Sequence, residues 1–233
     1  LNLRTSIFHN EKGDSTRNNY DLKSFNKLIN YFKDNKTLVV TNLITKNIDL
    51  EKNRDILLFD EKLVLNLNNL EISSDKKELL QLHFFKISEF TMGCNSGSNF
   101  IPLLFNKKLL FHNMALGEWR LNDHGKLAPI FLPKKYLDIK TKKLIPYKEI
   151  LNEKIVKLRK NEELLKQGIK ILDNSDDELL EASKEMISIN DSEKKIIKVE
   201  QIEFWKVYNS LYNTEYPEMI ISKNFYKNNK NLF

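Results

Sequence analysis

Residues 90–105 are FTMGCNSGSNFIPLLF, and this stretch decides the fold class. An apolar strand runs into a small polar turn that contains Gly93 and Gly97. Pro102 then stands in the first turn of a short helix, where a residue without an N–H does no harm. Residues 108–111 form the next apolar strand. Strand, turn, helix and strand are the repeating unit of a parallel sheet, so the stretch predicts an α/β fold.

The same alternation extends toward the N-terminus. Apolar residues recur at helical spacing over 22–32, and the β-branched run 37–43 has the composition of a strand covered on both faces. Further strands are expected at 1–7, 55–60 and 63–67, and a helix over about 74–86. We therefore predict that residues 1–150 form a Rossmann-like parallel sheet flanked by helices.

The character of the sequence changes after residue 150. Asn174 or Ser175 can cap a helix whose first turn is acidic, as the helix dipole favours. A later helix carries aromatic residues at helical spacing, which favours a core face: Phe204, Trp205, Tyr208 and Tyr212. We expect residues 151–233 to be a helical C-terminal extension packed on the same lobe.

The positive charge of the chain comes from lysine. The formal net charge is +6 at pH 7, but only five of the 38 basic residues are arginine. Arginine is the side chain that forks onto phosphates and base edges. We therefore predict no nucleic-acid partner.

The metal-binding residue types are sparse. Cys94 is the only cysteine, so the chain can form neither an internal disulfide nor a thiolate zinc site. The four histidines lack ligand spacing such as H-E-x-x-H. We predict no metal site and a reducing, cytoplasmic location.

No membrane span is predicted, because no apolar run approaches the roughly 18 residues that a span requires. The basic tail with Lys223, Lys227 and Lys230 is expected to be solvated and leaves open a peripheral contact with the inner membrane. The chain begins at Leu1 inside an apolar run and does not resemble a signal peptide. We expect it to be the C-terminal part of a longer protein.

The turn after the strand at 90–93 is a candidate phosphate site. Backbone N–H groups and the hydroxyls of Ser96 and Ser98 can donate to an anion, and Gly97 allows a diphosphate to approach the backbone. Ligands of α/β sheets gather at such carboxyl ends. The residues alone equally allow a tight turn whose serines cap a helix.

Two arginines are candidate partners for the same anion. Arg4 lies near the end of the first predicted strand, and Arg17 precedes Asn18 in the loop before the first helix. Two guanidinium groups over one sheet edge would suit a pyrophosphate. Taken alone, each arginine is better explained by a surface ion pair or a helix cap.

A set of short segments occurs in a fixed order along nearly the whole chain: Arg4, Arg17-Asn18, the block 92–105, Asn113, Leu132-Pro133-Lys134-Lys135, Asp173-Asn174-Ser175, Glu185-Met186, Ser222 and Phe225. Taken together and in this order, these segments resemble a family of bacterial glycosyltransferases with the GT-B fold. The sequence departs from the family pattern at Cys94, Asn95 and Asn106.

The resemblance implies that this chain is the C-terminal, donor-binding lobe of a two-lobed enzyme for bacterial surface polysaccharide synthesis. Its donor would be a nucleotide-diphosphate sugar, with no further cofactor, and its glycan acceptor would be bound with the missing N-terminal lobe. Arg4 and Arg17 would be catalytic. The donor would be bound by Asn18, Asn95, Ser96, Gly97, Ser98, Asn113 and Lys134.

Two alternatives remain open at this point. One is a nucleotide-sugar epimerase on the same fold, which would need its own carboxylates near the anomeric carbon; Asp14 and Glu118 are the nearest candidates. The other is a lobe without activity that serves as an interaction module through its helical C-terminus.

Overall fold

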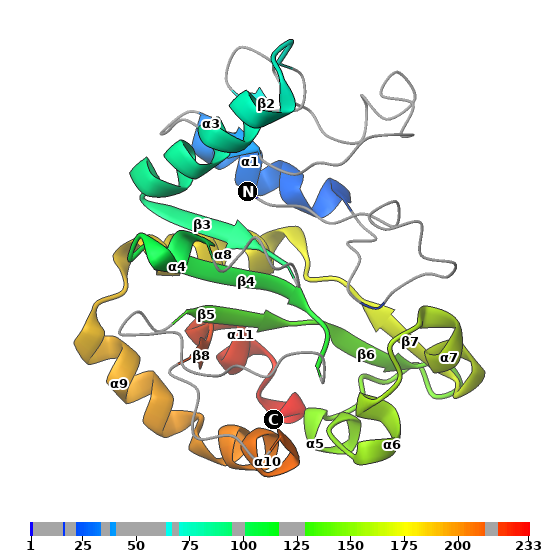
Figure 1. Ribbon diagram of the computed structural model, residues 1–233. Helices are drawn as coiled ribbons and strands as arrows, with labels where there is room; N and C mark the ends of the chain where they lie inside the picture. Colours follow the sequence, from blue (N-terminus) through cyan, green and yellow to red (C-terminus); the bar gives the residue numbers. More distant parts are fainter. Residues whose placement is uncertain are drawn as a thin grey trace.

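The structure is a computed structural model, and it describes residues 1, 16, 22–33, 38–40, 64–66, 70–94, 101–116, 129–212 and 219–233. Its centre is a four-stranded parallel sheet in the order β3-β4-β5-β8 (Figure 1). The strands are β3 (Phe90–Gly93), β4 (Lys108–Met114), β5 (Ile130–Pro133) and β8 (Ile220–Ile221). The α/β class and the parallel sheet flanked by helices are thereby confirmed.

Two smaller strand pairs accompany this sheet. Strands β1 (Leu38–Val40) and β2 (Val64–Asn66) pair in parallel. Strands β6 (Lys135–Asp138) and β7 (Ile169–Leu172) pair antiparallel, directly after β5 in the chain. The predicted strands at 1–7 and 55–60 lie outside the described residues.

Helices surround the sheet. In the N-terminal half the helices are η1 (Leu22–Phe25), α1 (Asn26–Lys33), α3 (Ser74–Ile87) and α4 (Ile101–Leu104). The later ones are α5 (Tyr147–Ile150), α6 (Glu153–Val156), α7 (Asn161–Lys166), α8 (Asp176–Ser188), α9 (Asp191–Glu200), α10 (Ile202–Tyr212), α11 (Lys223–Asn228) and η4 (Lys230–Leu232).

The two faces of the sheet pack against different helices, because successive side chains of a strand point to opposite faces. On one face, His112 lies against Phe25 with ring centroids 5.1 Å apart, and Met92 meets Ser183 of α8. On the other face, Phe131 lies against Trp205 of α10 at 6.1 Å. Both faces are therefore covered, which explains why β4 and β5 are buried almost throughout.

The C-terminal part of the chain takes part in this sheet. Strand β8 comes from beyond residue 150 and pairs with β5, and α8 packs against β4. The sequence analysis predicted helices here but neither β7 nor β8. The boundary at residue 150 itself stays a prediction.

A glutamine side chain completes the pairing of β8. Ile220 and Ser222 donate their N–H groups to carbonyls of β5 and of the residue preceding it, so the polar groups of Ile221 face away from that strand. Gln201, which is buried, accepts from the Ile221 N–H at 2.7 Å and donates to the Ile221 carbonyl at 2.7 Å. The amide thus replaces a neighbouring strand.

We expect Gln201→Ala to lower the free energy of unfolding by about 2 kcal/mol or more, because it leaves two buried backbone groups without partners. Urea titration followed by circular dichroism measures this loss. Gln167→Ala, at an exposed position, is the matched control and should change stability by less than about 0.5 kcal/mol. Equal losses in the two variants would contradict the role given to Gln201.

Candidate functional site

The candidate site is the carboxyl edge of the sheet. Strands β3, β4 and β5 run in the same direction, so Gly93, Met114 and Pro133 end at one edge (Figure 1). Ligands of open α/β sheets bind outside this edge. The predicted phosphate turn follows β3 directly in the chain.

Two asparagines fasten the ends of β4 and β7 to each other. The Asn113 N–H donates to Oδ1 of Asn174 at 2.7 Å, and the Asn174 N–H donates to Oδ1 of Asn113 at 2.6 Å. Nδ2 of Asn174 also donates to the Pro133 carbonyl at 2.9 Å. Asn113 has a φ of 50°, in the left-handed region that asparagine tolerates better than most side chains.

A buried ion pair lies beside the two asparagines. Lys134 Nζ is 2.8 Å from Asp173 Oδ1, and the two side chains are 0% and 4% exposed. The Lys134 N–H also donates to the Met114 carbonyl. A charge is tolerated at such depth only when it is paired, so this lysine depends on its aspartate.

The N-terminus of α8 meets the same edge and is already occupied. Ser175 caps the helix in a capping box with Glu178, and Glu178 also pairs with Lys135 at 2.7 Å. Lys27 of α1 approaches Asp176 at 3.3 Å and Asp177 at 2.9 Å, and these hydrogen bonds raise its pKa. An anionic ligand would meet an acidic, capped helix end here, so this helix N-terminus does not favour phosphate binding.

Thr16, the residue before Arg17, is fixed by hydrogen bonds to a segment far along the chain. Thr16 is buried, and both its N–H and its hydroxyl donate to the Arg159 carbonyl, at 3.0 and 3.1 Å. Arg159 lies between α6 and α7, which Figure 1 shows beyond the carboxyl ends of β4 and β5.

The predicted site residues are thus only partly within the described structure. Asn113 and Lys134 are at the carboxyl edge, where both are buried and bonded to protein groups. Their contacts to a donor stay a prediction. The other predicted residues lie outside the described residues: Arg4, Arg17, Asn18, Asn95, Ser96, Gly97 and Ser98.

The roles of Asp173 and Asn174 as partners of these two residues were not predicted from the sequence. Asp173-Asn174-Ser175 entered only as part of the family pattern, with Asn174 or Ser175 as a helix cap. Ser175 does cap α8, as predicted for one of two residues. The sequence pattern that could have indicated these roles is the short polar run 173–175, which lies between an apolar stretch and an acidic helix start. Such a run is expected at the edge of a sheet, where its polar groups can meet those of other strand ends.

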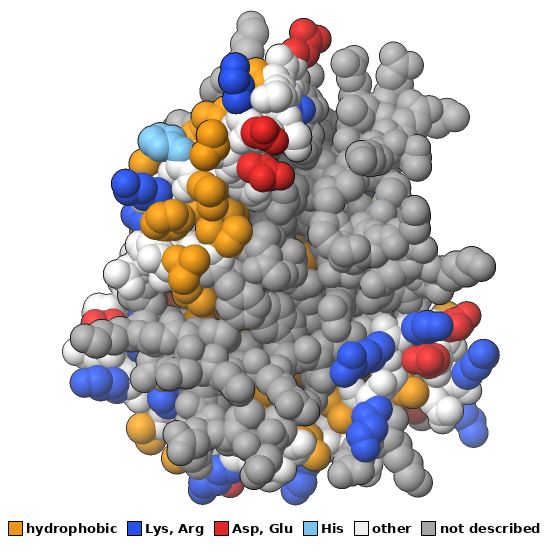
Figure 2. Space-filling model, in the orientation of Figure 1, with side chains coloured by type: hydrophobic (Ala, Val, Ile, Leu, Met, Phe, Trp, Pro, Cys, Tyr) orange, Lys and Arg blue, Asp and Glu red, His pale blue; other side chains and the backbone are white. Residues whose placement is uncertain are grey.

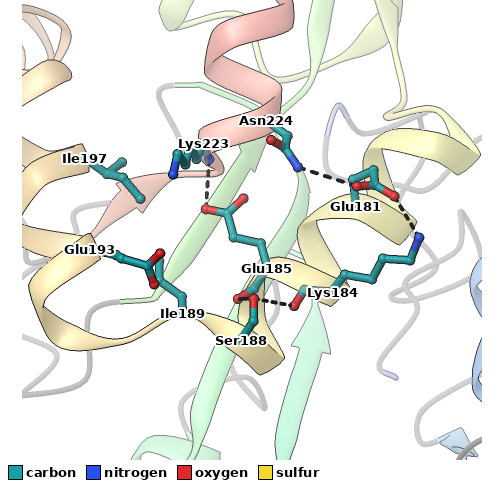
Figure 3. Close-up of a pocket in the computed structure, with 9 residues that line it drawn as sticks. All are labelled: Glu181, Lys184, Glu185, Ser188, Ile189, Glu193, Ile197, Lys223 and Asn224. Atoms are coloured by element: carbon teal, nitrogen blue, oxygen red, sulfur yellow. Dashed lines mark hydrogen bonds and ion pairs between the residues drawn. The ribbon is translucent and has the colours of Figure 1, made fainter.

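A pocket of about 300 Å³ lies away from this edge, among α8, α9 and α11 (Figure 3). Lys108, the first residue of β4, donates to the carbonyls of Met186 and Ile187, so this end of α8 lies at the amino end of the strands. Glu185 points between the helices and accepts from the Ser222 hydroxyl at 2.7 Å and from the Lys223 N–H at 2.9 Å. Its carboxylate therefore serves to fasten α8 to the start of α11.

Neither a metal cluster nor a membrane span is found in the described part of the chain. Its histidine, cysteine and acidic side chains form no group of three or more that could hold a metal ion. Within the same residues, no helix combines the length and the apolar character that crossing a bilayer requires.

Comparison with known proteins returned no match to any family model, to any curated protein or to any solved structure.

We expect Lys134→Met to destabilise the protein by about 3 kcal/mol, because it removes the ammonium group that pairs with the buried Asp173 carboxylate. The combined change Lys134→Met with Asp173→Leu should recover much of this loss, since neither member of the pair is then charged. Chemical denaturation measures all three proteins. Lys206→Met removes an exposed ion pair and is the control, expected within about 0.5 kcal/mol of the parent.

Burial raises the pKa of the Glu185 carboxyl above its usual 4.5, while its hydrogen bonds from Lys223 and Ser222 act in the opposite direction. The ionised form is therefore the costly one in the folded state. The stability that Glu185 provides should be full below pH 4.5 and should decrease as the pH rises through its folded pKa.

This pH dependence is measured as the difference in unfolding free energy between the parent and Glu185→Gln, which cannot titrate there. The difference should move in favour of the variant as the pH is raised from about 4 to 7. In a Ser222→Ala background the change of this free-energy difference between pH 4 and 7 should be larger, because the ionised Glu185 carboxylate loses a hydrogen-bond donor. A difference that is flat with pH would contradict the assignment.

Proposed function

We propose that this chain is the donor-binding lobe of a nucleotide-sugar-dependent glycosyltransferase that acts in bacterial surface polysaccharide synthesis at the cytoplasmic side of the inner membrane. The observation that carries the proposal is the carboxyl edge of the parallel sheet. The Asn113–Asn174 and Lys134–Asp173 pairs lie at this edge, and the Gly/Ser-rich stretch 95–98 comes one residue after β3 in the chain.

The buried Asn113–Asn174 and Lys134–Asp173 pairs support a donor site because they hold the carboxyl ends of the strands in fixed positions. They connect the ends of β4 and β5 with the segment between β7 and α8, so the loops over this edge start from fixed positions. A reaction that depends on the placement of a diphosphate benefits from such preorganised surroundings.

The charges at this edge indicate which groups would meet the diphosphate. Lys134 is paired with Asp173, and Lys135 is paired with Glu178. The positive charge facing a donor would therefore come from Arg4 and Arg17, together with the N–H groups of residues 95–98. The hydrogen bonds of Thr16 to Arg159 support this role for Arg17, which is the next residue in the chain.

The chemistry proposed for these groups is stabilisation of the leaving group. As the bond between the sugar and the diphosphate breaks, negative charge grows on the diphosphate. Guanidinium and N–H donors aimed at that charge lower the barrier. The acceptor and the base that activates it would belong to an N-terminal lobe.

A thermal-shift screen against UDP, GDP, CMP and ADP, free and as nucleotide sugars, tests the proposal. We expect one nucleotide class to raise the melting temperature selectively. Arg17→Ala should weaken binding of that nucleotide by about ten- to a hundredfold, the loss of one charge-assisted hydrogen bond or more. Arg54→Ala is the matched control, because Arg54 belongs to none of the segments that carry the family resemblance.

Three outcomes of this screen are distinct. Selective stabilisation that is lost in Arg17→Ala supports the donor lobe. Selective stabilisation accompanied by conversion of the nucleotide sugar to its epimer, which chromatography of the screened sample detects in the absence of an acceptor, would favour an epimerase. No stabilisation by any nucleotide, in a sample that is folded by circular dichroism, would overturn the proposal in favour of an interaction module.

A further inference from the structure

Helix α3 leaves most of its apolar surface uncovered. Of its 14 residues, Phe85 is the one that is buried. Leu79 is 66% exposed, Leu82 is 39% exposed and Ile87 is 58% exposed. Figure 2 shows hydrophobic side chains gathered over α3 and the neighbouring α4, where Leu104 is also exposed. An apolar surface of this kind on a folded chain marks an interaction site.

Four of the exposed residues of α3 form a stripe along the helix. Asp75, Leu79, Leu82 and Lys86 follow each other at intervals of four, three and four residues, and all four are exposed. These intervals place them on one side of the helix, away from the half-buried Lys77 and Phe84, while the buried Phe85 lies at the flank of the stripe. The same alternation of intervals forms the seam between two paired helices.

The charges in this stripe are complementary to those of a second, antiparallel copy of the same helix. Its first position is acidic (Asp75), its last is basic (Lys86), and the two leucines lie between. When a second α3 is laid antiparallel with Leu79 against Leu82, each Asp75 faces Lys86 of the other copy.

We propose that α3 is the contact of a symmetric homodimer, in which two copies of the helix pack antiparallel about a two-fold axis between Leu79 and Leu82. A two-fold interface brings the same patch of both subunits together, so it requires the self-complementary order of charges that α3 carries. Burial of this stripe in a lipid surface is disfavoured, because Asp75 lies within it and Glu78 lies at its margin.

Sedimentation velocity of the full chain over a series of concentrations tests the dimer. Asp75→Lys should weaken it by about tenfold or more, because each copy then places a lysine against Lys86 of the other. Lys86→Glu should weaken it similarly by placing two acids together. The double variant, Asp75→Lys with Lys86→Glu, restores opposite charges and should dimerise like the parent.

Mixing the two single variants gives a second test. One variant carries two basic ends and the other two acidic ends, so they should form a heterodimer with each other while each alone is mainly monomeric. Glu162→Lys, on an exposed part of α7, is the control and should leave the dimer unchanged. Circular dichroism verifies that all variants are folded.

The proposal is overturned when the parent remains a monomer at the highest soluble concentration, an outcome that would assign the stripe to a different protein. It is equally overturned when a dimer forms but the double variant fails to recover it, because the contact then lies elsewhere. Both outcomes are independent of nucleotide binding, so they are separable from failure of the proposed donor site.

Discussion

A lysine that is wholly removed from water sets the arrangement of the whole carboxyl edge. Lys134 follows β5 directly, and its buried ammonium group is stabilised by the Asp173 carboxylate 2.8 Å away. Asp173 follows β7, so the pair fixes two strands that belong to different sheets of the described structure. The exchange of hydrogen bonds between Asn113 and Asn174 then adds the end of β4 to the same cluster.

The packing around the sheet follows from this arrangement. Because β7 ends at the ion pair, α8 begins beside it and runs back across one face of the sheet toward the amino end of β4. There its last turns are held by Lys108 and, through Glu185, by the start of α11. The helix is therefore fastened at both ends, and the core between it and the strands is enclosed.

The sequence allowed the class of fold to be predicted because its alternation of elements is local. The helix predicted at 74–86 is α3, and one of the two proposed caps, Ser175, does begin α8. Strands β7 and β8 were missed because both are short. Strand β7 has four residues, one of which is an exposed lysine, and β8 has only two, so neither shows a clear alternation of apolar and polar residues. Short strands depend on tertiary contacts, which a sequence pattern does not contain.

The site was less predictable than the fold for the same reason. Asn113 and Lys134 were predicted as donor-binding residues, and their burial at the carboxyl edge depends on residues about 40 to 60 positions further along the chain. A polar residue at a strand end looks the same in sequence whether it faces a ligand or an interior partner. The exposed face of α3 was equally invisible, because an apolar stripe predicts a helix face and not what covers it.

The side chain of Gln201 has a consequence for the behaviour of the protein in a crowded solution. A strand at the border of a sheet offers unpaired N–H and C=O groups, onto which a strand of another molecule can add and start an aggregate. At β8 the Ile221 groups that would act as this template are taken by an amide that belongs to the same chain and lies in the interior. An amide side chain cannot extend into a further strand, so the sheet stops growing at this border and the chain is protected there against misassembly.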